Sequence, residues 1–587
     1  MKNKKTKNNV FATFVKLLKY LKRYQFHFWT SILFTAVSVI LSLYIPILVG
    51  RAIDEAIGAG NVNIDVIKQI LFKIIICIVI SALLQWFINI LNNKMTYGIA
   101  KNIRTEAFSK IQKFPISYID SHPTGEIVSR VITDVEQLSD GLLLGFTQFF
   151  NGIMTIIVTL FFMLMISPII TAVVVVVTPL SMFVASFIAK KTFAMFKLQS
   201  ETRSEQTGLV DESIEGKKVI RAFSQEDRVI ELFDEVNERL GKASLNAIFF
   251  SSITNPSTRF VNSIVYALVT LSGGLLFLSG KFGLTIGIIS SFLAYSTQYT
   301  KPFNEISGVI TELQNSFACA ERVFEVIEAP LIEEDSKESE QQRTNGDVDF
   351  VNVSFSYSSD KPLIENLNLS VKKGQRIAIV GPTGCGKTTL INLIMRFYDV
   401  DKGDILIGGR SIKDMSRKEL RTSCGMVLQD TWLSPASIRE NIAFGNKNAS
   451  DEEIIAAAKA AHAHSFIRRL PNGYDTVIGE DGGSLSQGQK QLLCIARLML
   501  SLPDILILDE ATSSIDTRTE IKIQKAFETM MDGRTTFIVA HRLSTIKEAD
   551  KIIVMRNGNI VECGTHSELL AKNGFYNELY NSQFCNL

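Results

Sequence analysis

The segment IVGPTGCGKT, residues 379–388, joins a short apolar run to a glycine-rich turn. Gly381, Gly386, Lys387 and Thr388 fit the spacing GxxxxGK[ST], with a strand pattern before the turn and a helical pattern after it. Glycines let backbone N–H groups close around phosphate oxygens, and the helix N-terminus adds positive potential. The segment therefore predicts an α/β domain that binds a nucleotide by its phosphates.

The residue types in this turn indicate how a nucleotide is held. The Lys387 ammonium neutralises the β and γ oxygens, and the Thr388 hydroxyl is placed to ligate Mg²⁺. Cys385 stands beside Lys387 at a helix N-terminus, so we expect its thiolate to be favoured and its alkylation to block ATP hydrolysis. The ATP-binding residues predicted here are Gly381, Pro382, Thr383, Gly384, Cys385, Gly386, Lys387, Thr388 and Thr389.

Three further apolar runs end in polar side chains. DILILDE ends in Asp509, predicted to hold Mg²⁺ through its water, and Glu510, predicted to polarise the attacking water. TTFIVAHR carries His541, and GMVLQD carries Gln429. Taken singly, each is also consistent with a strand ending in solvated or structural side chains. Together they fit ligand binding at the carboxyl ends of parallel strands.

The first 310 residues have a different composition. Between Asp140 and Lys190 no charged residue occurs, which is enough for two membrane spans with a turn at Ser167 and Pro168. A core helix of a soluble protein is the alternative, and the length of this uncharged run argues against it. Six spans are predicted, at about residues 24–50, 70–93, 141–166, 168–189, 251–280 and 283–305.

Orientation follows from the distribution of Lys and Arg. They collect in the N-terminal tail, between spans two and three, and between spans four and five. By the positive-inside rule, both termini and the nucleotide-binding domain are expected in the cytoplasm, with the spans in the plasma membrane. The cytoplasmic segments 94–140 and 190–245 are predicted as helical extensions, each with a short transverse helix, near 115–126 and 208–218.

Composition also sets the domain boundaries and excludes several classes. We predict a transmembrane domain over 1–328, a polar linker over 329–345 and a nucleotide-binding domain over 346–587. The net charge of +2 gives no reason to expect a nucleic-acid partner. The seven cysteines are scattered without a CxxC pair, so neither a disulfide framework nor a zinc site is predicted.

Over nearly its whole length the chain resembles an exporter-type half-transporter of the ATP-binding cassette (ABC) family. The likeness rests on the motifs above, on LSQGQ (485–489) before an amphipathic helix, and on FPISYIDSHPTGEIVSRVITDVEQL and GKKVIRAFSQE in the cytoplasmic segments. It implies a six-helix, all-α transmembrane domain followed by an α/β P-loop NTPase domain. It also implies ATP and Mg²⁺ as cofactors.

The resemblance further implies roles for single residues. Tyr357 looks like the aromatic that stacks on adenine, and Asp516 looks like the loop that communicates between two nucleotide sites. The transverse helices are similar to the helices that dock on the cassettes. The implied catalytic residues are Glu510, His541, Gln429 and Lys387; the implied Mg²⁺ residues are Thr388, Gln429 and Asp509; Gln429 joins the ATP-binding residues; and Leu485, Ser486, Gln487, Gly488 and Gln489 would face ATP held by a partner subunit.

Gln487 departs from the family pattern, which commonly has a glycine there. An altered signature with an intact Glu510 resembles one half of a heterodimeric multidrug exporter, and we favour that reading over a homodimer that tolerates glutamine.

The predicted function is ATP-driven export of hydrophobic or amphipathic compounds, drug-like molecules or lipids, by alternating access. An ATP-gated channel or sensor subunit, or an importer on the same scaffold, remains an alternative. A soluble ATPase of the DNA-repair kind is disfavoured by the six spans. The polar groups within the spans, Gln85, Asn89, Gln148 and Asn262, are scattered along the chain.

Overall fold

The computed structural model describes residues 2–57, 62–279, 284–332, 346–358, 361–428, 431–479, 483, 485–509, 515–539 and 543–584. The chain divides into two compact units. Unit 1 comprises residues 1–113 and 122–329, and unit 2 comprises residues 114–121 and 330–587. Most of the predicted linker, residues 333–345, lies outside the described residues.

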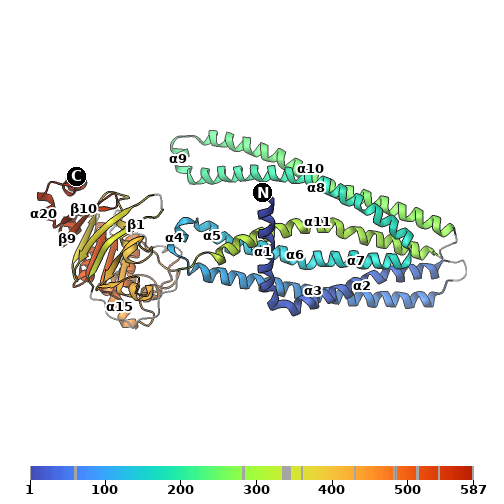
Figure 1. Ribbon diagram of the computed structural model, residues 1–587, viewed down its shortest axis with the longest axis horizontal. Helices are drawn as coiled ribbons and strands as arrows, with labels where there is room; N and C mark the ends of the chain where they lie inside the picture. The colour runs from blue at the N-terminus through green and yellow to red at the C-terminus, as the bar shows by residue number, and fades with distance from the viewer. Residues whose placement is uncertain are drawn as a thin grey trace. The chain divides into compact units, whose positions relative to one another are not determined.

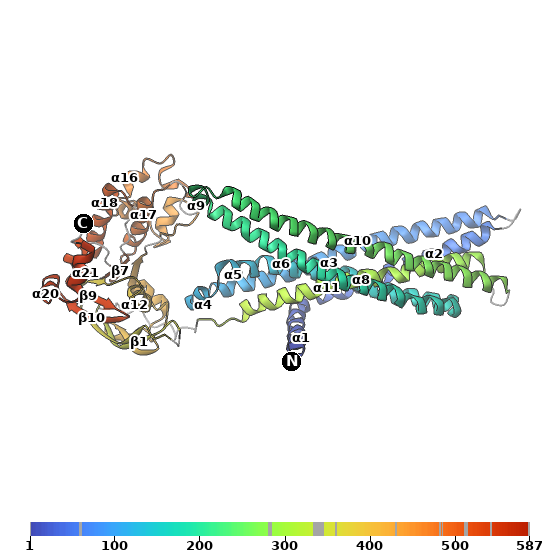
Figure 2. The same ribbon diagram turned by 90° about the horizontal axis from the view of Figure 1, so that it is seen from above.

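Unit 1 is a bundle of long helices, with α8 and α10 side by side and α1 projecting at a steep angle to the others (Figures 1 and 2). Its elements are α1 (Lys2–Leu21), η1 (Lys22–Tyr24), α2 (Gln25–Ala56), α3 (Ile64–Ile111), α5 (Thr124–Val131), α6 (Thr133–Leu144), η2 (Gly145–Phe149), α7 (Phe150–Ile166), α8 (Pro168–Glu215), α9 (Lys217–Ala222), α10 (Glu226–Leu278) and α11 (Ile286–Glu328).

Local chemistry sets the helix ends in unit 1. Ser167 is extended and Pro168 opens α8, so the predicted tight turn separates α7 from α8. The Asn63 side chain accepts a hydrogen bond from the backbone N–H of Val66 and caps α3. The Thr285 hydroxyl caps α11 in the same way by accepting from the N–H of Ile288.

Four helices among the described residues are long and apolar enough to cross a membrane. They lie within Ala12–Ala56, Ile64–Ile111, Thr124–Ile166 and Arg259–Leu278, and the first part of α8, Pro168–Pro179, is a shorter apolar stretch. The predicted sixth span, 283–305, lies on α11 and is not among them. It carries several hydroxyl and amide side chains together with Lys301 and Glu305, which lower its hydropathy.

Short helices occur in both segments that we predicted to be cytoplasmic, the second at the end of its predicted range. The predicted range 115–126 contains a short helix, α4 (Ile116–Ser121), which belongs to unit 2. In the second segment α8 continues to Glu215, so the short helix α9 begins only at Lys217, at the end of the predicted range 208–218. The backbone of Gly216 leaves the helical conformation and thereby ends α8.

Unit 2 is an α/β domain. Besides α4 its elements are β1 (Val348–Phe355), β2 (Ile364–Val371), β3 (Arg376–Val380), α12 (Lys387–Ile394), β4 (Lys402–Ile407), β5 (Arg410–Ser411), α13 (Arg417–Ser423), β6 (Cys424–Val427), α14 (Ile438–Ala443), α15 (Asp451–Ala460), α16 (His464–Ile467), η3 (Gly473–Asp475), α17 (Gln487–Met499), β7 (Ile505–Asp509), α18 (Thr517–Met531), β8 (Thr535–Val539), α19 (Leu543–Lys547), β9 (Lys551–Arg556), β10 (Asn559–Gly564), α20 (His566–Ala571) and α21 (Phe575–Phe584).

Two sheets organise this domain. One has the order β2-β1-β4-β5, and the other has the order β10-β9-β3-β8-β7-β6, in which β9, β3, β8, β7 and β6 are parallel. Side chains of the parallel strands alternate between two cores, one shared with α12 and the four-stranded sheet and the other with α17 and α18. The carboxyl ends of β3, β8, β7 and β6 therefore meet at one edge, which confirms the predicted fold class.

Candidate functional site

The turn after β3 can form only with glycines. Gly381, Gly384 and Gly386 have φ values of +155°, +79° and +101°, which L-side chains rarely adopt. A Cβ on Gly381 would lie 2.3 Å from the carbonyl oxygen of Met555 in β9. The loop thus wraps closely against the sheet before Gly386, as N-cap, directs the chain into α12. The N–H groups of its first turn are available to an anion.

The side chains of this loop face in two directions. The Lys387 ammonium donates to the carbonyl oxygens of Gly381 and Pro382, at 2.8 and 3.1 Å, and so lies over the loop. The Thr388 side chain is exposed, whereas Thr389 is buried. Pro382, Thr383 and Gly384 form the exposed crest of the turn.

Cys385 is not the reactive thiol that we expected. Its side chain is only 3% exposed and belongs to the core beneath the loop. Position at a helix N-terminus favours a thiolate, but reagents reach only accessible sulfur. The Cys385 N–H donates to the Pro382 carbonyl oxygen at 3.3 Å within the turn. Because the sulfur is buried, we no longer expect rapid alkylation of the folded protein.

Tyr357 lies beside the phosphate loop and is half exposed, as an adenine-stacking ring requires. Its hydroxyl donates to the Thr389 hydroxyl at 3.2 Å, which ties the ring to α12. Phe355 and Tyr398 meet the Tyr357 ring edge to face, with centroids 4.9 and 5.0 Å away. Three aromatic rings thus fix one wall next to the loop.

Tyr398 also connects this wall to α4, which sequence patterns did not reveal. Its hydroxyl donates a hydrogen bond to the Asp120 carboxylate, and both residues lie in unit 2. Burial, together with this hydrogen bond, raises the pKa of the Tyr398 phenol. The α4 segment therefore contacts the aromatic wall beside the candidate nucleotide site.

The other strand ends contribute as far as the structure describes them. Asp509 is the last residue of β7, pairs in register with Val539 of β8 and is 8% exposed. Its carboxylate lies at the same sheet edge as the phosphate loop. Gln429, Glu510 and His541 lie outside the described residues. In the sequence, Glu510 directly follows β7, and Gln429 and His541 come two residues after the ends of β6 and β8.

The predicted signature opens α17. Ser486 and Gln489 form a reciprocal capping box, in which the Ser486 hydroxyl accepts from the Gln489 N–H and the Gln489 side chain accepts from the Ser486 N–H. Leu485, before this cap, packs against the core. Gly488 is buried, and a Cβ there would lie 2.5 Å from Thr519 of α18. The glycine is therefore needed for α17 to approach α18.

Gln487 and Asp516 have contacts within the chain. The Gln487 amide nitrogen donates to the Thr431 hydroxyl at 3.3 Å. The Gln487 side chain thus contacts the segment that follows β6. Asp516 is the N-cap of α18, and the hydrogen bond from the Thr519 N–H lowers the pKa of its carboxyl.

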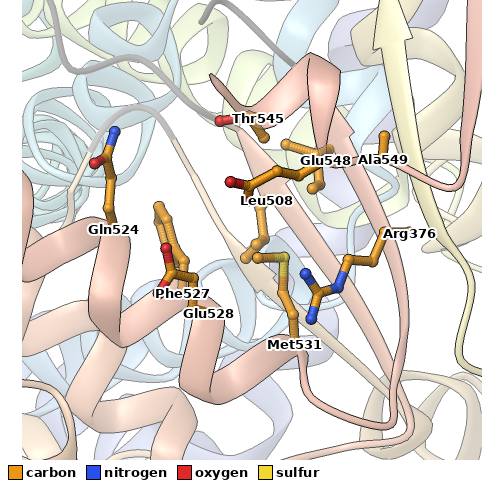
Figure 3. Close-up of a pocket in the computed structure, with 10 residues that line it drawn as sticks. Arg376, Leu508, Gln524, Phe527, Glu528, Met531, Thr545, Glu548 and Ala549 are labelled. Carbon is orange, nitrogen blue, oxygen red and sulfur yellow. The ribbon is translucent and has the colours of Figure 1, made fainter. Parts of the chain in front are cut away.

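Two cavities lie away from the phosphate loop. One, of about 130 Å³, lies between α18 and the sheet, with Phe527 and Met531 on one side and Arg376 and Glu548 on the other (Figure 3). It is on the face of the sheet opposite α12 and is therefore separate from the nucleotide site.

The second cavity, of about 610 Å³, lies in unit 1 between α2, α3, α7 and α11, and nine of its sixteen lining residues are polar. Of the four polar residues singled out from the sequence, Gln85 lines this cavity and Asn89, Gln148 and Asn262 do not.

Comparison with known proteins gives a consistent result over both units. Residues 28–303 match the family model of the ABC transporter transmembrane region, and residues 364–513 match the ABC transporter family model.

Among curated proteins, the chain is 40% identical over 553 residues to the uncharacterized ABC transporter ATP-binding protein YfiC of Bacillus subtilis, covering 94% of this chain and 91% of that protein. It is 40% identical to a fatty acid ABC transporter ATP-binding/permease protein of Mycobacterium bovis, over 85% and 79% of the two chains. A solved bacterial Atm1-family ABC exporter with ATP bound superposes with a TM-score of 0.76 at 25% identity, over 96% of this chain and 98% of that one.

Proposed function

Because the chain belongs to the ABC transporter family, as an exporter-type half-transporter whose ATP hydrolysis is coupled to transport, we propose that it exports amphipathic compounds by alternating access. The observation that carries this proposal is one chain with a phosphate-binding loop in unit 2 and a polar cavity among the apolar helices of unit 1. The multi-pass unit 1 lies in the membrane. We place both termini and unit 2 in the cytoplasm.

We propose that different residues of the site bind the phosphates, accept the proton of the attacking water and orient the reacting groups. Backbone N–H groups at the start of α12 bind phosphate oxygens, and Lys387 offsets their charge. Glu510 would accept the proton of a water whose oxygen attacks the γ-phosphorus, as the bond to the bridging oxygen breaks and ADP leaves. Gln429 and His541 would orient that water and the γ-phosphate. Tyr357 supplies the ring for adenine.

Mg²⁺ fits the donors that the structure describes. Thr388 offers an exposed hydroxyl in the first turn of α12, and Asp509 offers a carboxylate at the neighbouring strand end. Hard oxygen ligands of this kind, with Gln429 as a third, suit the ion. When bound, Mg²⁺ draws charge from the β and γ oxygens.

A second half-transporter completes the proposal. The segment 485–489 opens α17 with Ser486 and Gln487 exposed, and we propose that it faces ATP bound to the phosphate loop of a partner. Gln487 adds a side chain at that place, hydrogen-bonded within its own chain, which favours a heterodimer with two unequal sites. Asp516, the N-cap of α18, is the residue that we propose communicates between the two sites.

The cavity in unit 1 supports an amphipathic cargo over a purely hydrophobic one. Its lining combines hydroxyl and amide groups with Leu43, Ile45 and Ile78. Polar groups inside a membrane bundle are costly unless they serve a pathway or a ligand. Drug-like amphiphiles and lipids fit such a lining.

The function is tested with Glu510→Gln in the full-length protein, reconstituted with its partner in inverted vesicles. We expect ATP binding to stay within about twofold of wild type and turnover to fall by about a hundredfold or more, because only the base is removed. ATP-driven accumulation of a fluorescent amphiphile inside the vesicles should stop. Undiminished hydrolysis would exclude Glu510 as the base, and conductance without accumulation, or movement in the opposite direction, would contradict export.

A further inference from the structure

The position of the cavity in unit 1 can be measured along the helices from one end of the bundle. The end of α2, the start of α3, the end of α7 and the start of α11 lie at one end of the bundle (Figure 1). Lys301 follows the first residue of α11 by about four turns, roughly 22 Å at 1.5 Å per residue. The cavity thus lies within the predicted spans, and its Lys301 and Glu305 lie at the end of the sixth span, on the side that carries the Lys- and Arg-rich segments.

Its wall contains a cluster of hydroxyl groups contributed by two helices. The Ser81 hydroxyl on α3 lies 3.0 Å from that of Ser38 and 3.1 Å from that of Ser42, both on α2. A hydroxyl offers one proton and two lone pairs, so this trio retains hydrogen-bonding capacity toward the cavity. Gln85 and Asn151 add amide groups from α3 and α7.

Among the described residues that line this cavity, the charged ones are Lys301 and Glu305. The Lys301 ammonium lies 3.7 Å from the Glu305 carboxylate, and both side chains are at least half exposed. Between them stands Pro302, which has no N–H to donate to the Gln298 carbonyl four residues earlier. One turn of α11 thus contributes an ammonium and a carboxylate to the lining of the cavity, and the Gln298 carbonyl lacks the helical hydrogen bond from residue 302.

This charge pair restricts the head group that the cavity can take. An anionic head group is attracted by the Lys301 ammonium but repelled by the Glu305 carboxylate. A cationic head group is attracted by Glu305 but repelled by Lys301. An unpaired charge at this depth is costly. A zwitterionic head instead exchanges one ion pair for two, with its cation at Glu305 and its anion at Lys301. The hydroxyl and amide groups then bond its remaining oxygens.

We propose that the cavity binds the head group of a zwitterionic amphiphile, through Lys301, Glu305 and the Ser38–Ser42–Ser81 cluster. The inference rests on the proposed export function and names the class of cargo.

The test uses the full-length chain in lipid nanodiscs without nucleotide. Four probes share a twelve-carbon chain and differ in the head: dodecylphosphocholine, dodecanoate, dodecyltrimethylammonium and dodecyl maltoside. Saturable binding is measured by competition against tritiated dodecylphosphocholine, with empty nanodiscs as background. We expect dodecylphosphocholine to bind at least about tenfold more tightly than the other three, a difference of about 1.4 kcal/mol.

Two single variants should change the preference in opposite directions. Lys301→Met leaves Glu305 and should favour the trimethylammonium probe, whereas Glu305→Gln leaves Lys301 and should favour dodecanoate. The double exchange Lys301→Glu/Glu305→Lys keeps a pair and should keep the zwitterion preference, which also shows that the site has folded.

Lys197 and Glu201 on α8 form the matched control pair. They have the same spacing, order and 3.7 Å separation, but they do not line the cavity. Their neutralisation should leave the preference unchanged.

Equal binding of all four heads, or the same change in the Lys197 and Glu201 controls, would overturn the proposal. This assay involves neither hydrolysis nor transport. Its failure therefore leaves the vesicle experiment on Glu510 standing, and failure of the vesicle experiment leaves the binding result interpretable.

Discussion

Single residues decide whether the phosphate loop can form. At Gly381 an added Cβ would meet the Met555 carbonyl oxygen at 2.3 Å and the Cys385 sulfur at 2.7 Å. Gly384 has open space around it, so its φ of +79° is its only constraint. The motif spacing identified these glycines but gave no reason to distinguish them. Because the loop packs against β9, a side chain is tolerated less well at Gly381 than at Gly384.

We predict that Gly381→Ala weakens ATP binding by about tenfold or more, since strain of about 1–3 kcal/mol must be absorbed in the loop. Binding of a fluorescent ATP analogue to the full-length protein measures this. Gly374→Ala is the control, because Gly374 has a φ of +79° with nothing within 4 Å of an added Cβ. If both variants bind ATP as the wild type does, close packing at Gly381 does not shape the site.

Helix pairs are joined by contacts that lie far apart in the sequence. Along the seam between α2 and α11, the Ser291 hydroxyl donates to the Pro46 carbonyl at 2.8 Å and the Tyr295 hydroxyl donates to the Leu43 carbonyl at 2.5 Å. At the end of the seam, the Asp54 carboxylate accepts hydrogen bonds from the Thr285 hydroxyl at 2.6 Å and the Gly287 N–H at 2.8 Å. Asp54 thereby caps α11 from another helix.

We predict that Asp54→Ala lowers the stability of unit 1 by about 1–3 kcal/mol, because it leaves two donors unsatisfied at a helix N-terminus. The unfolding midpoint of the detergent-solubilised protein reports the change, and Asp54→Asn should recover part of it. Asp65→Ala is the comparison, since Asp65 also lies in the first turn of a helix but its side chain is 87% exposed. Equal losses for Asp54 and Asp65 would contradict the cap.

At the scale of the whole molecule, the proposed function assigns the phosphate loop and the signature of this chain to two different ATP molecules. The phosphate loop follows β3, whereas the exposed signature opens α17 on the other core of the sheet. On this proposal a second chain is required, and Gln487 would make the contribution of this chain unequal to that of a partner with glycine there.

We therefore predict that the chain purified alone hydrolyses ATP without cooperativity and without stimulation by amphiphiles, and that adding the partner restores both. Steady-state ATPase assays against ATP concentration, with and without cargo, measure this. Gln487→Gly serves as the companion variant and should raise the activity of the isolated chain, because it removes the side chain bonded to Thr431. Robust cooperative, cargo-stimulated hydrolysis by the unaltered chain alone would support a homodimer instead.

The sequence by itself determined the fold class, because local patterns carry it. Glycine spacing between a strand and a helix indicates a phosphate loop, alternating apolar residues indicate strands, and long uncharged runs indicate membrane helices. The residues at strand ends, such as Asp509, could be proposed for the same reason, since strand ends of one parallel sheet share an edge.

Only the tertiary structure decided which side chains meet. It buried Cys385, placed Gln487 on Thr431, joined Tyr398 to Asp120 and brought Ser81 and Lys301 to one cavity from helices more than 200 residues apart. Periodicity tells which face of an element is apolar, but not which partner that face finds. The reason is that contacts between elements depend on the packing of the whole bundle or sheet, and the sequence pattern records only one element at a time.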